Sequence, residues 1–276
     1  RLVERLLASP HYGERWARFW LDLARYTDAT ASWLEGTGQA YLYRDWVTGA
    51  FNADMPYNEF VKRQLATDLM PETGPAETPA LGFLGLSPTY WKELQLPPEI
   101  IKVIVADEWE ERIDTVSRTF LGLTVACARC HDHKFDPITS KDYYALAGVF
   151  ASTRLAERPV IAESDYAIVK AAQGKVKKLN DELKKLQKMK PPAKTAAARI
   201  AEIKKEIAEI EKSTPLYHTP TANAVAEASL YVERAGKTAQ SGTRIDYKPE
   251  PRDLNIFIRG NPNNLGPLVK RRFLSV

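Results

Sequence analysis

Cysteine is scarce in this chain. Cys127 and Cys130 are the two cysteines among 276 residues, and two residues separate them. A single closely spaced pair cannot form the network of crosslinks that holds small secreted domains together, so a disulfide framework is excluded. A redox site, a metal site or a haem site stays open, because each of these uses cysteines at such short spacing.

Long apolar runs are also missing. No stretch reaches the roughly 18 apolar residues that cross a bilayer, so the sequence predicts no transmembrane segment. With 44% hydrophobic and 27% charged residues, the composition is that of an ordinary globular protein. The chain starts at Arg1, without a methionine and inside the apolar pattern of residues 2–7, so we expect it to be a fragment of a larger protein.

The chain lacks a strong overall charge. Its net charge is +4, but residues 166–212 contain 13 Lys or Arg against 6 Asp or Glu, so this segment alone carries +7. The remainder therefore sums to −3, which does not indicate a general surface for nucleic acid. We predict no nucleic-acid partner, and we interpret the basic segment as the solvated face of a pair of helices.

The first helical segments carry many aromatic residues. Ser9 is suited to be the N-cap of a helix and Pro10 to be its first residue. The following aromatic and leucine side chains recur at helical spacing and predict one buried face. This face comprises Trp16, Phe19, Trp20, Leu23 and Tyr26.

Helical patterns continue through about residue 155. We expect further helices at residues 39–53 and 57–69 and one that starts near Ser140. The proline-containing residues 71–100 predict an extended loop between them.

The helix that leads to the cysteines should begin near Asp107. Its apolar residues recur at alternating steps of four and three and predict one continuous stripe. The stripe comprises Trp109, Ile113, Val116, Phe120, Leu123 and Cys127. Cys130 and His131 follow at the next i+3 and i+4 positions, so we expect all three site residues to point inward.

The sequence after residue 160 changes character twice. Residues 161–213 repeat a heptad pattern on both sides of Pro191 and Pro192, which predicts an inserted antiparallel helical hairpin of the coiled-coil type. Residues 214–276 contain short alternating segments and turns, which predict a small β-module that packs back on the helices. With an α-rich domain at residues 1–160, the expected fold is mainly α, of the α+β class.

Residues 127–131 read Cys-Ala-Arg-Cys-His, the C-x-x-C-H spacing of c-type haem attachment. On a helical turn, residues i, i+3 and i+4 share one face, so two thiols can bond to one edge of a porphyrin while the imidazole meets the iron. In this interpretation Cys127 and Cys130 form the thioethers. His131 is then the proximal ligand of the haem iron.

The ligand on the opposite side of the iron would decide the chemistry. Methionine suits electron transfer, histidine gives a lower potential, and an open position admits a small molecule or peroxide. The sequence offers His11, His218, Met55 and Met70 as candidates and does not choose among them. Whether the protein is an enzyme therefore stays open.

Two other interpretations of the same residues stay open. Cys127, Cys130 and His133 have the spacing C-x2-C-x2-H, and Asp136 could complete a tetrahedral Zn²⁺ site. No second C-x2-C or H-x3-H pair supports this set. Alternatively, the thiols are buried as small hydrophobic groups and His131 caps a helix. In either case the chain would be a non-haem scaffold or binding module.

Four separated blocks resemble a known family. They begin LVERLL, YRDWVT, RIDTVS and RDLNIF and cover residues 2–26, 43–70, 112–153 and 252–274. In this order they are similar to the planctomycete cytochrome-like domain PSCyt2, also called DUF1549, a domain of unknown function. The helical hairpin resembles a variable insertion.

The resemblance implies a larger secreted or periplasmic protein, often with a PSCyt1 cytochrome c-like domain before this one and a PSD1 (DUF1553) domain after it. It implies Cys127, Cys130 and His131 as the haem-binding motif and an extracytoplasmic location, where c-type haem is attached. Its partners would be neighbouring domains of the same polypeptide or a redox partner. The resulting hypothesis is a c-type haem module for electron transfer, although the resemblance implies no known reaction.

Overall fold

The computed structural model describes residues 1–28, 39–90, 93–188 and 194–275. No helix in these ranges combines the length and hydrophobicity that a membrane span requires.

The chain divides into two compact units. The larger unit comprises residues 1–73, 77–158 and 222–276, and the smaller unit comprises residues 74–76 and 159–221. The last segment of the chain thus belongs to the same unit as the first 73 residues. The division into three domains made from the sequence stays a prediction.

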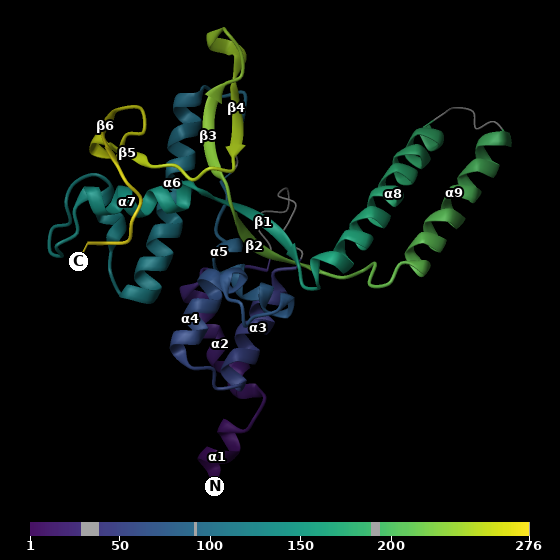
Figure 1. Cartoon of the computed structure of the whole chain (residues 1–276), viewed down its shortest axis with the longest axis horizontal. Helices are drawn as coiled ribbons and strands as arrows, with labels where there is room; N and C mark the ends of the chain where they lie inside the picture. The colour runs from purple at the N-terminus through teal and green to yellow at the C-terminus, as the bar shows by residue number, and fades with distance from the viewer. Residues whose placement is uncertain (29–38, 91–92, 189–193, 276) are drawn as a thin grey trace. The chain divides into compact units, whose positions relative to one another are not determined.

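Helices begin the larger unit. They are α1 (Leu2–Leu7), α2 (His11–Leu23), α3 (Tyr41–Asn52), α4 (Tyr57–Ala66) and the 3-10 turn η1 (Thr67–Leu69). Helix α2 follows directly after Pro10, whose missing N–H costs nothing at a helix start, and it packs along α3 (Figure 1). The helices predicted at residues 39–53 and 57–69 are confirmed.

The predicted buried aromatic face of α2 is wrong in part. Trp20 is buried, but Trp16, Phe19 and Leu23 are between 45% and 50% exposed. Helix α2 faces the core with the narrow side that carries Ala17 and Trp20. These three apolar side chains lie farther around the helix and remain in contact with water.

Gln64 connects three of these helices. Its side chain is fully buried, and its Oε1 accepts hydrogen bonds from Trp20 Nε1 at 2.8 Å and from the Tyr43 hydroxyl at 2.7 Å. Its Nε2 donates to the carbonyl of Phe60 at 2.9 Å. Because Trp20 lies on α2 and Tyr43 on α3, one side chain of α4 satisfies donors from both other helices.

We expect Gln64→Leu to lower the free energy of unfolding by about 2 kcal/mol, because leucine leaves two buried donors without their acceptor. Trp20 and Tyr43 would keep the 3.1 Å hydrogen bond between them, which limits the loss. The measurement is denaturant unfolding, with Gln187→Leu on the exposed side of α8 (Glu163–Lys188) as the control. Equal stabilities for the two variants would contradict the role of this network.

Residues 71–100 are not the extended loop that their prolines predict. They contain the 3-10 helix η2 (Pro75–Leu81) and the short helix α5 (Gly82–Gly85). Leu81 and Phe83 are at most 1% exposed and belong to the core. The burial of these apolar side chains outweighs the local preference of the prolines, and a 3-10 helix accommodates Pro79 inside it.

Two helices form the centre of the larger unit. Helix α6 (Pro98–Val116) starts with a proline, and α7 (Ser140–Ala151) starts with a capping box between Thr139 and Asp142. The start of α7 near Ser140 is therefore confirmed. Between α6 and α7 lie a π-helical turn, η3 (Ser117–Leu121), and a 3-10 turn, η4 (Val125–Arg129).

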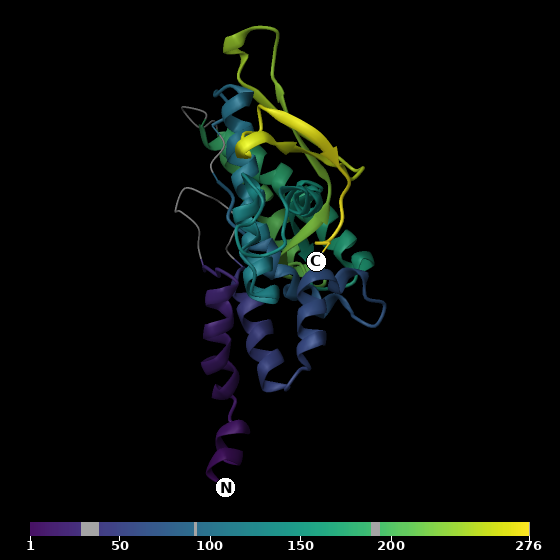
Figure 2. The same ribbon diagram turned by 90° about the vertical axis from the view of Figure 1, so that its left-hand side faces the viewer.

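The strands form three two-stranded ladders, β1–β2, β3–β4 and β5–β6. The last two ladders are antiparallel; β3 and β4 contact α6, while β5 and β6 contact α7 (Figure 1, Figure 2). The α+β class is therefore confirmed. Single 3-10 turns, η5 (Ala239–Ser241) and η6 (Ile258–Gly260), interrupt this region. The strands are β1 (Thr153–Pro159), β2 (Thr221–Glu227), β3 (Ser229–Arg234), β4 (Thr243–Lys248), β5 (Leu254–Phe257) and β6 (Leu265–Val269).

The smaller unit contains α8 (Glu163–Lys188) and α9 (Lys194–Ser213), which contact each other (Figure 1). Val176 and Ile203 are buried, and Arg199 Nε of α9 lies 2.9 Å from Glu182 Oε1 of α8. The Pro-Pro turn lies outside the described residues. The coiled-coil geometry of this pair stays a prediction.

Candidate functional site

The cysteines do not lie on the continuation of α6. The helix gives way to the π-helical turn η3, and Gly122 then adopts a left-handed conformation with φ +66°. Glycine takes this conformation without steric cost and is the usual residue just after a helix end. The continuous helix predicted to reach Cys127 is therefore wrong, because the π-helical turn and Gly122 separate α6 from η4.

The 3-10 turn η4 that carries the cysteines is firmly attached to the core. Val125 and Ala128 are fully buried, and the hydroxyl of Tyr144 on α7 donates to the carbonyl of Arg129 at 2.9 Å. The Arg129 guanidinium contacts Glu110 of α6 and lies 2.7 Å from Asp107. Backbone and side-chain contacts from two helices thus fix the position of η4.

Both thiols face solvent. Cys127 and Cys130 are free cysteines with exposed side chains, so the prediction that they point inward is wrong. In a 3-10 helix, side chains at i and i+3 eclipse each other. Because Cys127 lies in η4 and Cys130 ends it, the two thiols emerge on the same side of an anchored turn. Exposure also does not fit the interpretation that they fill space in the core.

The imidazole of His131 is exposed and has one nitrogen available. Its Nδ1 lies 2.8 Å from the backbone carbonyl of Asp132. A carbonyl accepts hydrogen bonds, so Nδ1 is the donor in this contact and Nε2 is the ring nitrogen left for another partner. Metal-binding histidines commonly donate the second ring N–H to a backbone carbonyl in this way.

His133 holds the loop after the cysteines instead of presenting a free nitrogen. Its Nδ1 accepts hydrogen bonds from the backbone N–H groups of Phe135 at 3.2 Å and Asp136 at 2.8 Å. Its Nε2 lies 2.8 Å from Thr124 Oγ1 and donates to it, since Nδ1 is already the acceptor. Both nitrogens are therefore engaged within the protein, which agrees with a structural role in the loop.

The alternative zinc set does not come together. Asp136 Oδ2 lies 3.3 Å from His133 Nδ1. Yet no three His, Cys, Asp or Glu side chains in the described part of the chain are placed so that they could share a metal ion. The structure therefore does not assemble Cys127, Cys130, His133 and Asp136 into one tetrahedral site.

An open pocket of about 620 Å³ lies beside the thiols. Cys127, Cys130 and His131 line it together with the apolar Phe135, which is 84% exposed. Gly260, from the turn after β5, lies on another side of the pocket. This contact could not be predicted from local patterns, because the turn-rich segment around Gly260 is 130 residues from Cys130 and has the composition of an ordinary turn.

Gly260 approaches Cys130 closely. Its φ is +72°, and a Cβ at this position would lie 2.7 Å from Cys130 Sγ. We expect Gly260→Ala to displace the turn, cost about 1 kcal/mol of stability, and raise the rate at which Cys130 reacts with a thiol reagent. The measurement is that rate in a Cys127→Ser background. Gly174→Ala on α8, where a Cβ meets no atom within 4 Å, is the control and should leave it unchanged.

The four candidates for a sixth iron ligand are not brought to this pocket. His11 lies at the exposed start of α2, where Nδ1 is 2.8 Å from Glu14 Oε2. Met55 packs against the core, Met70 follows η1, and neither lines the pocket. His218 belongs to the smaller unit.

Comparison with protein families identifies a match for the first part of the chain. Residues 1–155, more than half of the chain, match the model of PSCyt2, described as a protein of unknown function (DUF1549). The matched segment contains helices α1 to α7 and both cysteines, but not the turn with Gly260. No curated protein and no solved structure matched the chain.

Proposed function

Because the chain belongs to the PSCyt2 family, whose function is unknown, we propose that Cys127, Cys130 and His131 hold a covalently attached c-type haem. The haem would supply one-electron redox chemistry. The domain would then be a redox module of a larger extracytoplasmic polypeptide. Its electron partner would be a neighbouring domain or a separate redox protein.

The presentation of the two thiols carries this proposal. Both are exposed on the same side of the anchored turn η4, at a pocket of about 620 Å³. Thiols that only fill space are buried as small hydrophobic groups. Attachment to one edge of a porphyrin instead requires two thiols on one side of the chain and open space beside them.

The donor set of His131 also fits a haem iron. Its Nδ1–H is held by the carbonyl of Asp132, which leaves Nε2 as the nitrogen that would face a metal ion. His131 is exposed beside Cys130, so the three groups of the motif are accessible from solvent.

The two thiols would hold the haem through thioethers, each the product of S–H addition across a vinyl C=C bond, which forms one C–S bond and one C–H bond without a change in the number of electrons. Cys127 and Cys130 would each provide one such bond. Arg129 and Tyr144 would act as positioning residues, because their contacts with α6 and α7 fix the turn between the thiols.

We infer that, among the described residues of the pocket, His131 alone would bind the iron. Apart from His131, His133 is the single histidine among the described residues that line the pocket, and both of its nitrogens are hydrogen-bonded. No methionine is among these residues. The reduced haem protein is therefore expected to bind carbon monoxide, which a shift of its main absorption band would reveal.

The test is to express the chain through a c-type cytochrome maturation pathway and to record its intact mass and pyridine haemochrome spectrum. The proposal expects the mass of one covalent haem and the absorption band of a thioether-linked haem. A control cytochrome must mature in the same cells. Protein at its apo mass beside a mature control would overturn the proposal and leave an exposed dithiol to explain.

For the smaller unit we propose an antiparallel coiled coil. Support comes from the heptad spacing of its apolar residues, from the burial of Val176 and Ile203, and from the ion pair between Arg199 and Glu182. Its lysine-rich outer surface would be a solvated face.

A further inference from the structure

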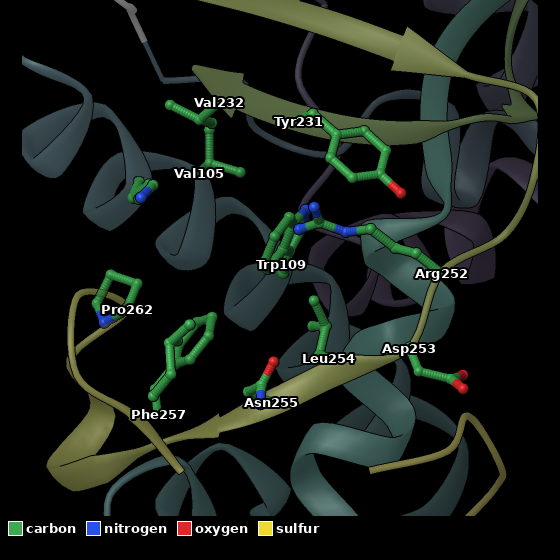
Figure 3. A pocket seen from close by; sticks show the side chains of 12 residues that line it. Val105, Trp109, Tyr231, Val232, Arg252, Asp253, Leu254, Asn255, Phe257 and Pro262 are labelled. Carbon is green, nitrogen blue, oxygen red and sulfur yellow. The ribbon is translucent and has the colours of Figure 1, made fainter. Parts of the chain in front are cut away.

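A cavity of about 200 Å³ lies in the larger unit, and its lining shares no residue with the pocket beside Cys127 and Cys130. Helix α6, strand β3 and strand β5 form its walls, and the turn before β6 closes one side. Figure 3 shows Arg252 reaching toward Trp109 and Tyr231, while Asp253 points away from them. The apolar lining residues are Val105, Trp109, Val232, Leu254, Phe257, Pro262 and Leu265.

Arg252 is a cation at this cavity without a carboxylate as its ion-pair partner among the described residues. Its guanidinium carbon lies 5.4 Å from the ring centroid of Trp109 and 4.6 Å from that of Tyr231. Stacking uses the faces of the guanidinium, and Tyr231 also forms a side-chain hydrogen bond with Arg252. Its Nε–H is buried without a hydrogen-bond partner, and no carboxylate forms an ion pair with it among the described residues. A buried donor in this state is costly unless something supplies an acceptor.

The acid beside Arg252 is already neutralised. Asp253 Oδ1 lies 3.0 Å from Arg271 Nη1 and also accepts a hydrogen bond from the Arg271 backbone N–H at 3.0 Å. Lys102 lines the cavity, and the Lys248 ammonium lies 4.5 Å from the ring centroid of Tyr231. Burial lowers the pKa of Arg252, which reflects the cost of a cation without a counter-ion. The charge around the cavity therefore favours an anion.

The size of the cavity limits that anion. A dry cavity of about 150 Å³ holds a benzene molecule, so a cavity of about 200 Å³ has room for one ring and one small charged group. The planar guanidinium matches the two oxygens of a carboxylate. We propose that this cavity binds a small monocyclic carboxylate, with the carboxylate on Arg252 and the ring against Trp109 and Phe257. The ring can be aromatic or a sugar, since both pack on aromatic faces.

The proposal is tested by calorimetric titration of the full chain with sodium benzoate and sodium glucuronate. Benzamide and glucose serve as the neutral partners of these two probes, and inorganic phosphate tests for an unspecific anion. A ligand of about ten non-hydrogen atoms is expected to bind with a Kd of about 1 mM or below. Binding of benzoate alone, glucuronate alone or both supports the proposal and distinguishes an aromatic acid from a sugar acid. No binding of either, or equal binding of neutral partners or phosphate, overturns it.

Two substitutions place the ligand in the cavity. Arg252→Lys keeps the positive charge but loses the paired N–H groups, and it should weaken carboxylate binding at least about tenfold. Lys102 is half-buried at the cavity wall, so Lys102→Glu tests the charge even if the Arg252 variant does not fold. It should weaken binding by a similar factor, whereas Lys170→Glu on the exposed side of α8 should change nothing. Unchanged binding in a folded Arg252 variant or in Lys102→Glu would overturn the proposal.

Discussion

Replacing Asp142 by alanine is expected to lower the free energy of unfolding by about 3 kcal/mol, because a buried carboxylate with several donors is removed. Asp142 is 1% exposed. It accepts hydrogen bonds from Thr139 Oγ1 and Ser275 Oγ, both at 2.6 Å, and lies 2.8 Å from Arg272 Nη2. The carboxylate thus caps α7 and ties the C-terminal segment to it. Denaturant unfolding at pH 7, followed by circular dichroism, measures the loss.

The same carboxylate gives the stability a pH dependence. Burial alone would raise the pKa of Asp142, but the hydrogen bonds from Ser275 and Thr139 and the Arg272 cation hold it well below its usual range. The folded state therefore has the lower pKa, and the unfolded value is about 3.9. The stabilisation is complete above that value and is lost as the pH falls through it toward the folded pKa.

The difference in unfolding free energy between the parent protein and Asp142→Asn should accordingly shrink between pH 7 and about pH 3. Asp181→Asn provides the matched control, because Asp181 is exposed on α8. Asp181→Asn should change the unfolding free energy only slightly at every pH. A difference for Asp142→Asn that stays constant across this range would show that the carboxylate's charge is not what stabilises the folded state.

Local signals were sufficient for most helices. Pro10 near the start of α2 and the apolar spacing in α3, α4 and α7 each mark an element through local residues alone. The end of α6 carried an equally local signal in Gly122, but the apolar stripe continues past it at helical spacing. Apolar periodicity shows which residues can face a core, but it does not show where a helix ends. Here the helical segment ends at Gly122, which adopts the left-handed conformation.

The orientation of the candidate site could not be predicted by the same means. The C-x-x-C-H spacing identified Cys127, Cys130 and His131 as a group. Their exposure, however, depends on which side of η4 packs against the core. Val125 and Ala128 occupy the inward positions, so the thiols are left on the outside. The exposed side of α2 has a similar origin, since packing on one neighbour buries only part of an apolar face.

The remaining features that the sequence did not predict are contacts between segments that are far apart in the chain. Gly260 lies against Cys130, and Tyr144 joins η4 to β5 through a second hydrogen bond to the carbonyl of Phe257 at 3.3 Å. Arg252 and Trp109 are 143 positions apart and yet stack in one cavity. No periodic pattern within a single segment contains this information, because it arises when β3 and β5 pack against α6 and α7.

The double variant Cys127→Ser, Cys130→Ser is expected to abolish covalent haem completely, because a hydroxyl does not form the thioether. Intact mass after expression through the maturation pathway is the measurement. Val125 and Ala128 hold η4 in the core independently of the exposed thiols. The unfolding free energy of the double variant should therefore match that of the parent apo-protein within about 0.5 kcal/mol, the usual range for exposed substitutions. A variant that loses the haem but keeps its stability would show that the two thiols are needed for haem attachment and not for folding.

His131→Ala is expected to behave differently from the cysteine variants. It should keep the haem mass, because both thiols remain, but its absorption spectrum should shift because the iron loses the imidazole nitrogen. His11→Ala, at the exposed start of α2, is the control and should leave mass and spectrum unchanged. If His131→Ala kept the parent spectrum, another group would be the proximal ligand, and the free Nε2 beside Cys130 would not be the reason for the motif. If the serine variant still gained a haem mass, attachment would not run through these thiols at all.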